Sequence, residues 1–424
     1  MLDIAKMTKL DSRVFETFLT NELKELVSIF KKHNYEIRVA GGAVRDIIMN
    51  IAPKDVDLAT NATPTQMKLM FEEEKIRMLN RNGEKHGTIT VRLNDDVNYE
   101  ITTLRIDVIT DGRHAAVEFT GDWVLDANRR DLTVNSLFLD FDGNVYDYFN
   151  GVDDINKREI HFVGEPDKRI KEDYLRIMRY FRFYGRISMN DHMFDEKALD
   201  AIRDNAAGLL NVHGERIWVE FKQIIVGRFA DILVKKIVEL GVHKFIGLPE
   251  NANPNEFSKL YNRKNNSLHS FQPTTLICSL IDTQEELEDF SKRVKLSNEE
   301  KKLAEFILKY RNLAHDLTDP LKPYKCLLVD FFKDNKIQEK IGQLLLYQGQ
   351  SELVENILAW NIPAFPIHGD MIANLGVPKG PLFSKIINEL KEMWKNELNF
   401  NNNQQVLIDR AIQIYSQSKE QTNT

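Results

Sequence analysis

Hydrophobic and polar residues alternate with a period of two in several short segments of the first 145 residues, as they do in half-buried β-strands. These segments are 35–41, 55–60, 87–93, 98–106 and 135–141. Two intervening segments, 42–50 and 63–74, carry apolar residues at helical spacing, and the second starts with Thr-Pro, which suits a helix cap and first turn. The pattern therefore predicts a first domain of mixed strands and helices.

Beyond about residue 160 the strand pattern disappears, and apolar residues recur at the spacing of helices to the end of the chain. Stretches rich in Pro, Gly or Asn interrupt this pattern at 247–256, 319–323 and 361–370. No repeat of fixed period is present. We therefore predict an α+β head followed by a long, all-helical remainder.

Charge changes this picture only locally. The 424 residues carry a formal net charge of −7, which excludes a surface that is positive throughout. The segment 168–186, however, holds seven Lys or Arg residues against Glu172 and Asp173, a local net charge of +5. Phosphate binding needs positive charge concentrated on one face, so any contact with nucleic acid must use a patch of this kind.

The two cysteines lie far apart and match no metal-ligand spacing, which indicates a reducing, intracellular compartment. No apolar run reaches the ~18 residues that a membrane span needs, so no membrane association is expected. The N-terminal residues are too acidic for a convincing transit peptide. Removal of a mitochondrial presequence stays an open alternative.

Residues 38–49 are predicted to form a strand, a Gly-Gly turn and the start of a helix. Gly41 and Gly42 would let backbone N–H groups approach an anion at the helix start, where the helix dipole favours negative charge. An ordinary tight turn is the simpler alternative. The spacing matches neither a dinucleotide-binding fingerprint nor a P-loop.

Two carboxylates follow about a dozen residues later. Asp55 and Asp57 alternate with an apolar residue, so on a strand both would project from one face, ~7 Å apart. Such a pair can share Mg²⁺, which prefers one or two carboxylates together with substrate phosphates. Glu100, on an adjacent strand, could supply a third carboxylate. This combination suggests phosphoryl transfer with two metal ions, whereas the alternative is a polar strand edge.

The segment 129–136 adds Arg129, Arg130, Asp131 and Asn135. Two arginines suit a triphosphate because guanidinium groups bind phosphate oxygens in pairs, and Asp and Asn suit ribose hydroxyls. Taken alone, the segment could equally be a helix cap with salt bridges. Beside a carboxylate pair it favours nucleotide binding.

A further helix is predicted where arginines are interleaved with aromatic residues. Arg176, Arg179, Arg182 and Arg186 fall within a sector of ~120° on this helix, and Asp173 lies at its margin. The apolar residues of the same segment point elsewhere, towards a core. A solvated charged face is the ordinary explanation for such a helix, but the motifs upstream argue for a binding role.

In combination, these motifs resemble the class II tRNA nucleotidyltransferases, the CCA-adding enzymes, in their eukaryotic form. The resemblance rests on motifs in family order: GGAVRD (41–46), DVD (55–57), RRDLTVNS (129–136), DYFNGVDDINKREIHFVG (147–164), EDYLRIMRYFRFYGR (172–186) and GERIWVE (214–220). A further segment, 368–394, resembles the tail of the family, so the similarity extends over nearly the whole chain.

The resemblance implies a head related to the DNA polymerase beta-like nucleotidyltransferases, with a mixed sheet, and an all-helical neck, body and tail. The corresponding boundaries are 1–145, 146–213, 214–315 and 316–424. Enzymes of this family add C, C and A to the 3′ end of tRNA from CTP and ATP without a nucleic-acid template. The implied cofactor is a pair of Mg²⁺ ions, for which Mn²⁺ can substitute, and the implied partners are CTP, ATP and the tRNA acceptor end.

The resemblance also assigns residues of the head and neck. Asp55 and Asp57 match the metal-binding pair of the family, and Glu100 takes the place of its third catalytic carboxylate. Nucleotide binding is assigned to residues of three motifs, namely Gly41, Gly42, Arg45, Arg129, Arg130, Asp131, Asn135, Asp173, Arg176, Arg179 and Arg182.

Two other segments resemble functional parts of the family. The segment 103–123 resembles its flexible loop, which helps the site switch from CTP to ATP, and contributes Arg105, Asp107 and Arg113. Lys379, in the Gly-Pro-rich start of a predicted helix, is expected to hold a tRNA phosphate. An ordinary helix start is the alternative there.

Asp173 and Arg176 can present an acceptor and a donor fork to one base edge. Cytosine and adenine both offer an amine beside an acceptor nitrogen, which fits a carboxylate and a guanidinium. Uracil and guanine place a carbonyl where the amine would be, and two acceptors repel. The resemblance assigns base selection to the same pair, with Glu172 expected to steady Asp173.

Alternatives stay open. An enzyme that adds only part of CCA, or a poly(A) polymerase, would share this chemistry, although the segment 80–91 resembles CCA-adding enzymes more than bacterial poly(A) polymerases. A non-catalytic RNA-binding relative is the alternative from another class, but it would not need two costly carboxylates. The sequence leaves open the oligomeric state, monomer or homodimer, and the distribution between mitochondria, cytosol and nucleus.

Overall fold

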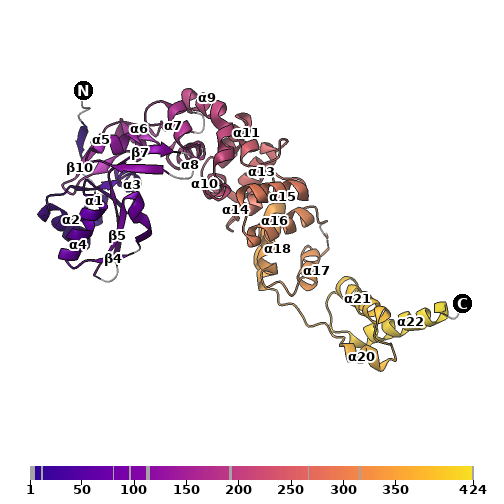
Figure 1. Ribbon diagram of the computed structural model, residues 1–424. Coiled ribbons are helices and arrows are strands. Elements are labelled where there is room, and N and C mark those ends of the chain that lie inside the picture. The colour runs from indigo at the N-terminus through magenta and orange to yellow at the C-terminus, as the bar shows by residue number, and fades with distance from the viewer. Residues whose placement is uncertain are drawn as a thin grey trace. The chain divides into compact units, whose positions relative to one another are not determined.

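The computed structural model describes residues 5–10, 13–79, 81–94, 97–110, 115–190, 193–265, 267–314, 316 and 318–422. The chain divides into two compact units. These are Met1–Tyr261 with Leu276–Lys301, and Asn262–Thr275 with Lys302–Thr424. In the described residues, strands occur only in the N-terminal part of the chain, and helices follow (Figure 1). The finer division into head, neck, body and tail stays a prediction.

The first unit is built on an eight-stranded sheet with the order β1-β10-β9-β2-β3-β6-β5-β4, and β7 pairs with β8 in a separate ribbon. β3 and β6 are parallel, and the other neighbours in the large sheet are antiparallel, so the predicted mixed sheet is confirmed. The strands are β1 (Lys6–Lys9), β2 (Ile37–Ala40), β3 (Asp57–Thr60), β4 (Arg77–Leu79), β5 (Thr88–Leu93), β6 (Val97–Thr103), β7 (Arg105–Thr110), β8 (Ala115–Phe119), β9 (Phe138–Leu139) and β10 (Asn144–Asp147).

The two helices that the sequence predicted in the head, at 42–50 and 63–74, are both present as α3 and α4. The Thr63 hydroxyl accepts a hydrogen bond from the backbone N–H of Gln66, as expected of a helix cap. The helices are α1 (Arg13–Phe18), α2 (Asn21–Lys32), α3 (Gly42–Ile48), α4 (Pro64–Glu73), α5 (Trp123–Asn128), α6 (Gly151–Lys157), α7 (Pro166–Glu172), α8 (Arg176–Ile187), α9 (Glu196–Asn205), α10 (Gly214–Val226), α11 (Ala230–Glu239) and α12 (Val242–Phe245).

The remainder is helical, as predicted. Its helices are α13 (Pro254–Asn265), α14 (Pro273–Ile277), α15 (Gln284–Val294), α16 (Asn298–Tyr310), α17 (Lys322–Asp330), α18 (Ile337–Gln348), α19 (Val354–Ala359), α20 (Gly369–Asn374), α21 (Pro381–Asn396) and α22 (Gln404–Thr422). Trp394, Leu390 and Leu407 belong to a buried core that joins α21 to α22. None of the described helices is both long and apolar enough to span a membrane.

Three predicted strands differ in extent from the observed ones. The strand predicted at 55–60 begins only at Asp57, because residue 55 lies in a bend. The strand predicted at 98–106 is two strands, β6 and β7, on either side of the buried Leu104. Its backbone N–H donates to the carbonyl of Thr60 and its carbonyl accepts from Thr120, which redirects the chain between the two sheets. The strand predicted at 135–141 is only the two residues of β9.

Phe138 lies at the centre of the sheet core. It sits on β9 between β10 and β2, is fully buried, and packs edge-to-face against Trp123 with ring centroids 4.9 Å apart. The guanidinium of Arg130, which lines the cavity described below, lies 4.9 Å from the centre of the Phe138 ring. One aromatic side chain thus joins the core to the functional surface.

We expect Phe138→Ala to lower the free energy of unfolding of the first unit by about 3–5 kcal/mol, because the substitution removes buried apolar surface and leaves a cavity. Urea denaturation followed by circular dichroism measures this loss. Leu69→Ala is the matched control, since Leu69 is 64% exposed on α4, and its effect should stay within about 0.5 kcal/mol. A loss below about 1 kcal/mol for Phe138→Ala would contradict the central position of this residue.

Candidate active site

A cavity of about 590 Å³ in the first unit brings together most of the residues that the sequence predicted to be functional. Those that line it are Gly41, Gly42, Arg45, Asp55, Asp57, Asp107, Arg129, Arg130, Asp131, Asn135, Asp173, Arg176, Arg179 and Arg182. Arg186, whose role the sequence left open, lines it as well, and so do Asp46, Lys54 and Phe183, which the sequence reasoning did not single out. Motifs more than 130 residues apart therefore form one site.

The Gly-Gly turn fixes the edge of this cavity. Gly41 has φ +66°, a conformation that strains any other residue, and a Cβ atom there would lie 2.8 Å from Nη1 of Arg130. Arg45 follows on α3, and its Nη1 donates a hydrogen bond of 2.5 Å to Oδ1 of Asn135. The glycine motif and the segment 129–136 are thus joined directly.

Asp126 anchors the two arginines of the segment 129–136. It is 1% exposed, and its carboxylate accepts from Nε of Arg129 and from Nη2 of Arg130, both at 2.9 Å. Burial alone would raise the pKa of Asp126, but the two guanidinium groups outweigh it and hold this pKa below its ordinary value of 3.8. The sequence reasoning missed this residue, although its spacing of three and four residues to the arginines is a detectable signal.

Asp131 connects the sheet domain to α8. Its Oδ2 accepts a hydrogen bond of 2.5 Å from Nε of Arg179, and its Oδ1 accepts one of 3.3 Å from Nδ2 of Asn135. Burial would raise the pKa of Asp131, but the charge of Arg179 lowers it below the ordinary value. Asp131, which the sequence predicted to bind ribose, is therefore also the ion-pair partner of Arg179 on α8.

Asp173 and Arg176 do not lie on one continuous helix, contrary to the prediction. α7 ends at Glu172, Asp173 has extended backbone angles, and α8 begins at Arg176. A turn still brings them together, because the backbone N–H of Arg176 donates to the carbonyl of Asp173 at 3.0 Å. Both residues line the cavity.

The expected support of Asp173 by Glu172 is wrong. Oε2 of Glu172 accepts from Nη1 of Arg176 at 2.7 Å and from Nη1 of Arg169 at 2.8 Å. Asp173 is instead held by Arg216 on α10, whose Nη2 donates to its Oδ2 at 2.9 Å. The two residues are 43 positions apart, so only the packing of α10 reveals this contact.

The remaining arginines of α8 are also held by carboxylates. Nε of Arg182 lies 3.0 Å from Oε2 of Glu220, which is buried on α10, and Nη2 of Arg186 donates to Oδ2 of Asp46 at 2.8 Å. Burial raises the pKa of Glu220, although the guanidinium of Arg182 opposes this shift. The four arginines predicted to share a face of this helix thus all line the cavity, although Arg186, whose side chain is 49% exposed, also reaches solvent.

The predicted metal-binding carboxylates lie at the edge of the sheet. Asp57 opens β3 and is the register partner of Glu100 on the parallel strand β6, while Asp55 precedes the strand. All three are exposed, and none of the three forms a hydrogen bond or ion pair in the described part of the chain. Although the Asp57 side chain reaches solvent, the protein atoms around it reduce its hydration and raise the pKa of its carboxyl; Arg130 opposes this shift and Asp55 adds to it. Carboxylate oxygens without a partner are ligands of the kind that a divalent cation takes.

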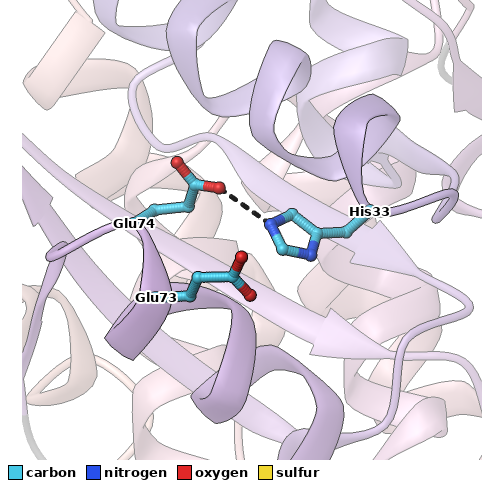
Figure 2. A group of neighbouring side chains, drawn as sticks. All are labelled: His33, Glu73 and Glu74. Carbon is cyan, nitrogen blue, oxygen red and sulfur yellow. Dashed lines mark hydrogen bonds and ion pairs between the residues drawn. The ribbon is translucent and has the colours of Figure 1, made fainter.

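These three carboxylates do not converge on one point, however. Among the described residues, only two groups place three ligand atoms within 4.8 Å of one another: His33 with Glu73 and Glu74, and a group around His161. Figure 2 shows the imidazole of His33 directed at Glu74, with Glu73 beside it. Oε1 of Glu74 is hydrogen-bonded to Nε2 of His33 at 2.8 Å and to Lys32 at 2.6 Å. We therefore interpret this group as an ion-paired contact between the ends of α2 and α4 rather than as a metal site.

The other predicted residues lie apart from the cavity or outside the described residues. Glu100 does not line it but borders an adjacent hollow. Arg105 donates to the backbone carbonyl of His86 from the start of the β7–β8 ribbon, and Arg113 lies outside the described residues. Lys379 is exposed just before α21 in the second unit. Their functions stay predictions.

We expect Asp126→Asn to lower the free energy of unfolding of the first unit by about 3–5 kcal/mol at pH 7, because it leaves the guanidinium groups of Arg129 and Arg130 without their buried counter-charge. Since the pKa of Asp126 is depressed in the folded state, its contribution is complete above the ordinary value and is lost as the pH falls through the folded value. The difference in free energy of unfolding between Asp126→Asn and the unsubstituted protein should therefore become smaller only below about pH 4.

Urea titrations at pH 7, 5 and 3.5 measure this dependence. Asp107→Asn is the control, because Asp107 lies 3.9 Å from Arg129 and is more exposed than Asp126. The loss of unfolding free energy in Asp107→Asn should stay below about 1 kcal/mol. Equal losses for the two variants would contradict a specific anchoring role for Asp126.

The family models locate the similarity of this chain to known proteins. A model described as "Poly A polymerase head domain" matches residues 37–161. A second model, described as "Probable RNA and SrmB- binding site of polymerase A", matches residues 193–252. The first match includes the cavity motifs up to residue 136 and every strand of the large sheet except β1, and the second contains α10.

Curated relatives match most of the chain. CCA tRNA nucleotidyltransferase 1, mitochondrial, of Homo sapiens is 48% identical over 390 residues, which cover 91% of this chain and 89% of the relative. The protein of the same name from Danio rerio is 45% identical over 416 residues, which cover 97% of this chain and 94% of the relative. Both relatives are thus similar over the sheet domain and the helical remainder.

Solved structures share the fold. The Bacillus stearothermophilus CCA-adding enzyme in complex with CTP superposes with a TM-score of 0.70 at 24% identity, covering 97% of this chain and all of that one. The Thermotoga maritima CCA-adding enzyme complexed with tRNA superposes with a TM-score of 0.67 at 16% identity, covering 95% and 98%. At these identities the likeness concerns the fold.

Proposed function

This chain belongs to the CCA tRNA nucleotidyltransferases, and from that premise we propose how its cavity works. We propose that it adds C, C and A to the 3′ end of tRNA from CTP and ATP, with the cavity as nucleotide site and the adjoining carboxylates as the metal site. The observation that carries the proposal is the convergence of seven arginines and the unpaired Asp55 and Asp57 on one cavity.

The arginines suit a triphosphate. Guanidinium groups bind phosphate oxygens in pairs, and their carboxylate partners fix them before a ligand arrives. Arg129 and Arg130 are oriented by Asp126, and Arg179 is oriented by Asp131. Binding therefore needs little reorganisation of charge, which is the condition for strong electrostatic stabilisation of a transferring phosphoryl group.

Asp173 and Arg176 suit the base. The carboxylate of Asp173 accepts from Arg216 and from the backbone N–H of Leu175, and the lone pairs that remain can accept a base amine. Arg176 uses both hydrogens of Nη1 and one hydrogen of Nη2, so Nε and one further hydrogen remain for a ring nitrogen. This arrangement accepts cytosine and adenine and repels the carbonyl groups of uracil and guanine.

Asp55 and Asp57 would hold divalent cations, for which we propose two Mg²⁺ ions with Mn²⁺ as substitute. Bound there, the ions would polarise phosphate oxygens and neutralise charge that develops during transfer. The 3′ oxygen of tRNA forms a bond to the α-phosphorus while the bond to pyrophosphate breaks. Glu100, the register partner of Asp57, would accept the hydroxyl proton in this scheme.

The remaining proposals concern partners and location. The curated relatives are named as mitochondrial proteins, and we propose that this chain acts in mitochondria and also in the cytosol and nucleus. We propose that Lys379 and the tail segment contact tRNA. Arg105, Asp107 and Arg113 would belong to a loop that adjusts the site between CTP and ATP. The protein would act as a monomer or homodimer.

Primer extension tests the activity. On a tRNA transcript that ends at the discriminator base, we expect two additions with CTP and Mg²⁺ and a stop at three with CTP and ATP. Asp55→Ala with Asp57→Ala should reduce the rate by about 10³-fold or more, because the metal ligands are lost. EDTA should abolish activity, and Mg²⁺ or Mn²⁺ should restore it.

The control is Asp142→Ala, since Asp142 is an exposed carboxylate in a turn and should leave the rate unchanged. A long A ladder would indicate a poly(A) polymerase instead. A stop after CC, or extension only of a CC-ended tRNA, would indicate a partial-CCA enzyme. Binding of tRNA without any extension would indicate a non-catalytic RNA-binding protein.

A further inference from the structure

Helix α10 carries two residues that hold side chains of the arginine-lined cavity. Arg216 donates to Oδ2 of Asp173 at 2.9 Å, and Glu220 lies 3.0 Å from Nε of Arg182. Residues four positions apart share one face of a helix, so this face of α10 is directed at α8 and at the segment that precedes it. The position of the Asp173 carboxylate therefore depends on where α10 lies.

The opposite face of α10 is held by the start of α16. Nε1 of Trp218 donates to Oε1 of Glu300 at 2.9 Å, and Nζ of Lys222 lies 3.3 Å from the same oxygen. The other carboxylate oxygen of Glu300 accepts from the backbone N–H of Ser297 at 2.9 Å, which fixes the side chain at the helix start. These residues of α16 belong to the first unit together with α10. The middle of α10 is thus anchored from outside the cavity.

The start of α10 is held by Arg293, near the end of α15. The guanidinium of Arg293 donates three hydrogen bonds to backbone carbonyls, namely from Nη2 to Leu209 at 2.7 Å, from Nη1 to Val212 at 3.2 Å and from Nε to Phe245 at 3.1 Å. Two of these carbonyls lie in the segment that leads directly into α10. Because a guanidinium presents its donors in a rigid planar fork, three carbonyls together fix that segment against α15.

The backbone of α10 also touches α15 directly. A Cβ atom added at Gly214, the first residue of α10, would overlap the carbonyl oxygen of Arg293 and lie 2.9 Å from Cα of Val294. The overlapping atoms belong to the backbone and cannot turn aside as a flexible side chain would. Glycine is therefore required for this close approach. Arg216 lies two residues further along, within the same first turn.

We propose that Arg293 is a positioning residue for base selection. It holds the start of α10, α10 holds Arg216 against Asp173, and the carboxylate of Asp173 is thereby directed at the amine of the base. Arg293 is not among the residues that line the cavity, so it acts through α10. This inference rests on the proposed function, because it assigns a distant support to the same base-selecting pair.

The discrimination between CTP and UTP tests this role. On a tRNA transcript that ends at the discriminator base, we expect Arg293→Ala and Gly214→Ala each to lower the ratio of kcat/KM for CTP to kcat/KM for UTP. The decrease should be about tenfold or more, because a small misplacement of a positioned group has effects of this size. Gly214→Ala keeps the Arg293 side chain, and Ala is more favourable than Gly in a helix, so any decrease reflects the lost close approach.

The matched control is Arg203→Ala, since Arg203 is an arginine of α9 whose side chain is 52% exposed. This variant should keep the ratio within about twofold. A loss of stability alone would reduce the amount of active protein and lower both rates alike, so it would not change the ratio. The thermal midpoint of each variant shows whether it is folded. If Arg293→Ala does not fold, Gly214→Ala and the milder Arg293→Lys decide the test.

A double variant tests whether Arg293 acts through Arg216. Arg216→Ala should lower the same ratio, and combining it with Arg293→Ala should cause no further decrease, because both substitutions remove one chain of contacts. Multiplication of the two separate effects would contradict this path and overturn the inference.

The outcomes separate this inference from the proposed function. Unchanged ratios in both Arg293→Ala and Gly214→Ala would overturn the inference and leave the proposed function intact. Equal use of CTP and UTP by the unsubstituted protein would contradict the proposed base selection, and the inference with it. If the protein adds no nucleotide, the proposed activity is wrong, and isothermal titration with CTP and UTP then gives the ratio of affinities on which the same variants are compared.

Discussion

The concentration of positive charge around one cavity is the constraint on which the rest of the site depends. Seven arginines line the cavity, and like charges that line one cavity repel one another strongly where little water screens them. Carboxylates resolve this conflict, and four of them are buried: Asp46, Asp126, Asp131 and Glu220. Each holds one or two guanidinium groups in place, so the arginines are neutralised and oriented before a triphosphate binds.

This compensation explains why distant parts of the chain are needed. Helix α5 and the loop after it supply Asp126 and Asp131, whereas Glu220 and Arg216 come from α10 and reach α8 and Asp173. The parallel pairing of β3 and β6 places Asp57 beside Glu100, at the edge where we propose that metal ions bind. The proposed nucleotide site and the proposed metal site thus both belong to the first unit.

Much of this arrangement could be predicted from the sequence. Strand periodicity placed Asp57 and Glu100 on neighbouring strands, and the motif order placed the arginines in one site. The sequence did not reveal the break at Asp173, because the residues around it keep helical spacing. Nor did it reveal the bend at Asp55 or the contact between Asp173 and Arg216, since the latter depends on how α10 packs. Asp126 was detectable in principle, because it is spaced to pair with Arg129 and Arg130 on one helical turn.

In the mechanism proposed above, a prearranged cavity selects the base through Asp173 and Arg176. Isothermal titration of the unsubstituted protein with CTP, ATP, UTP and GTP in Mg²⁺ tests it most directly. We expect CTP and ATP to bind and UTP and GTP to bind at least about tenfold more weakly, because the carbonyl groups of uracil and guanine meet the carboxylate of Asp173. Equal affinity for all four nucleotides would contradict base selection by Asp173 and Arg176.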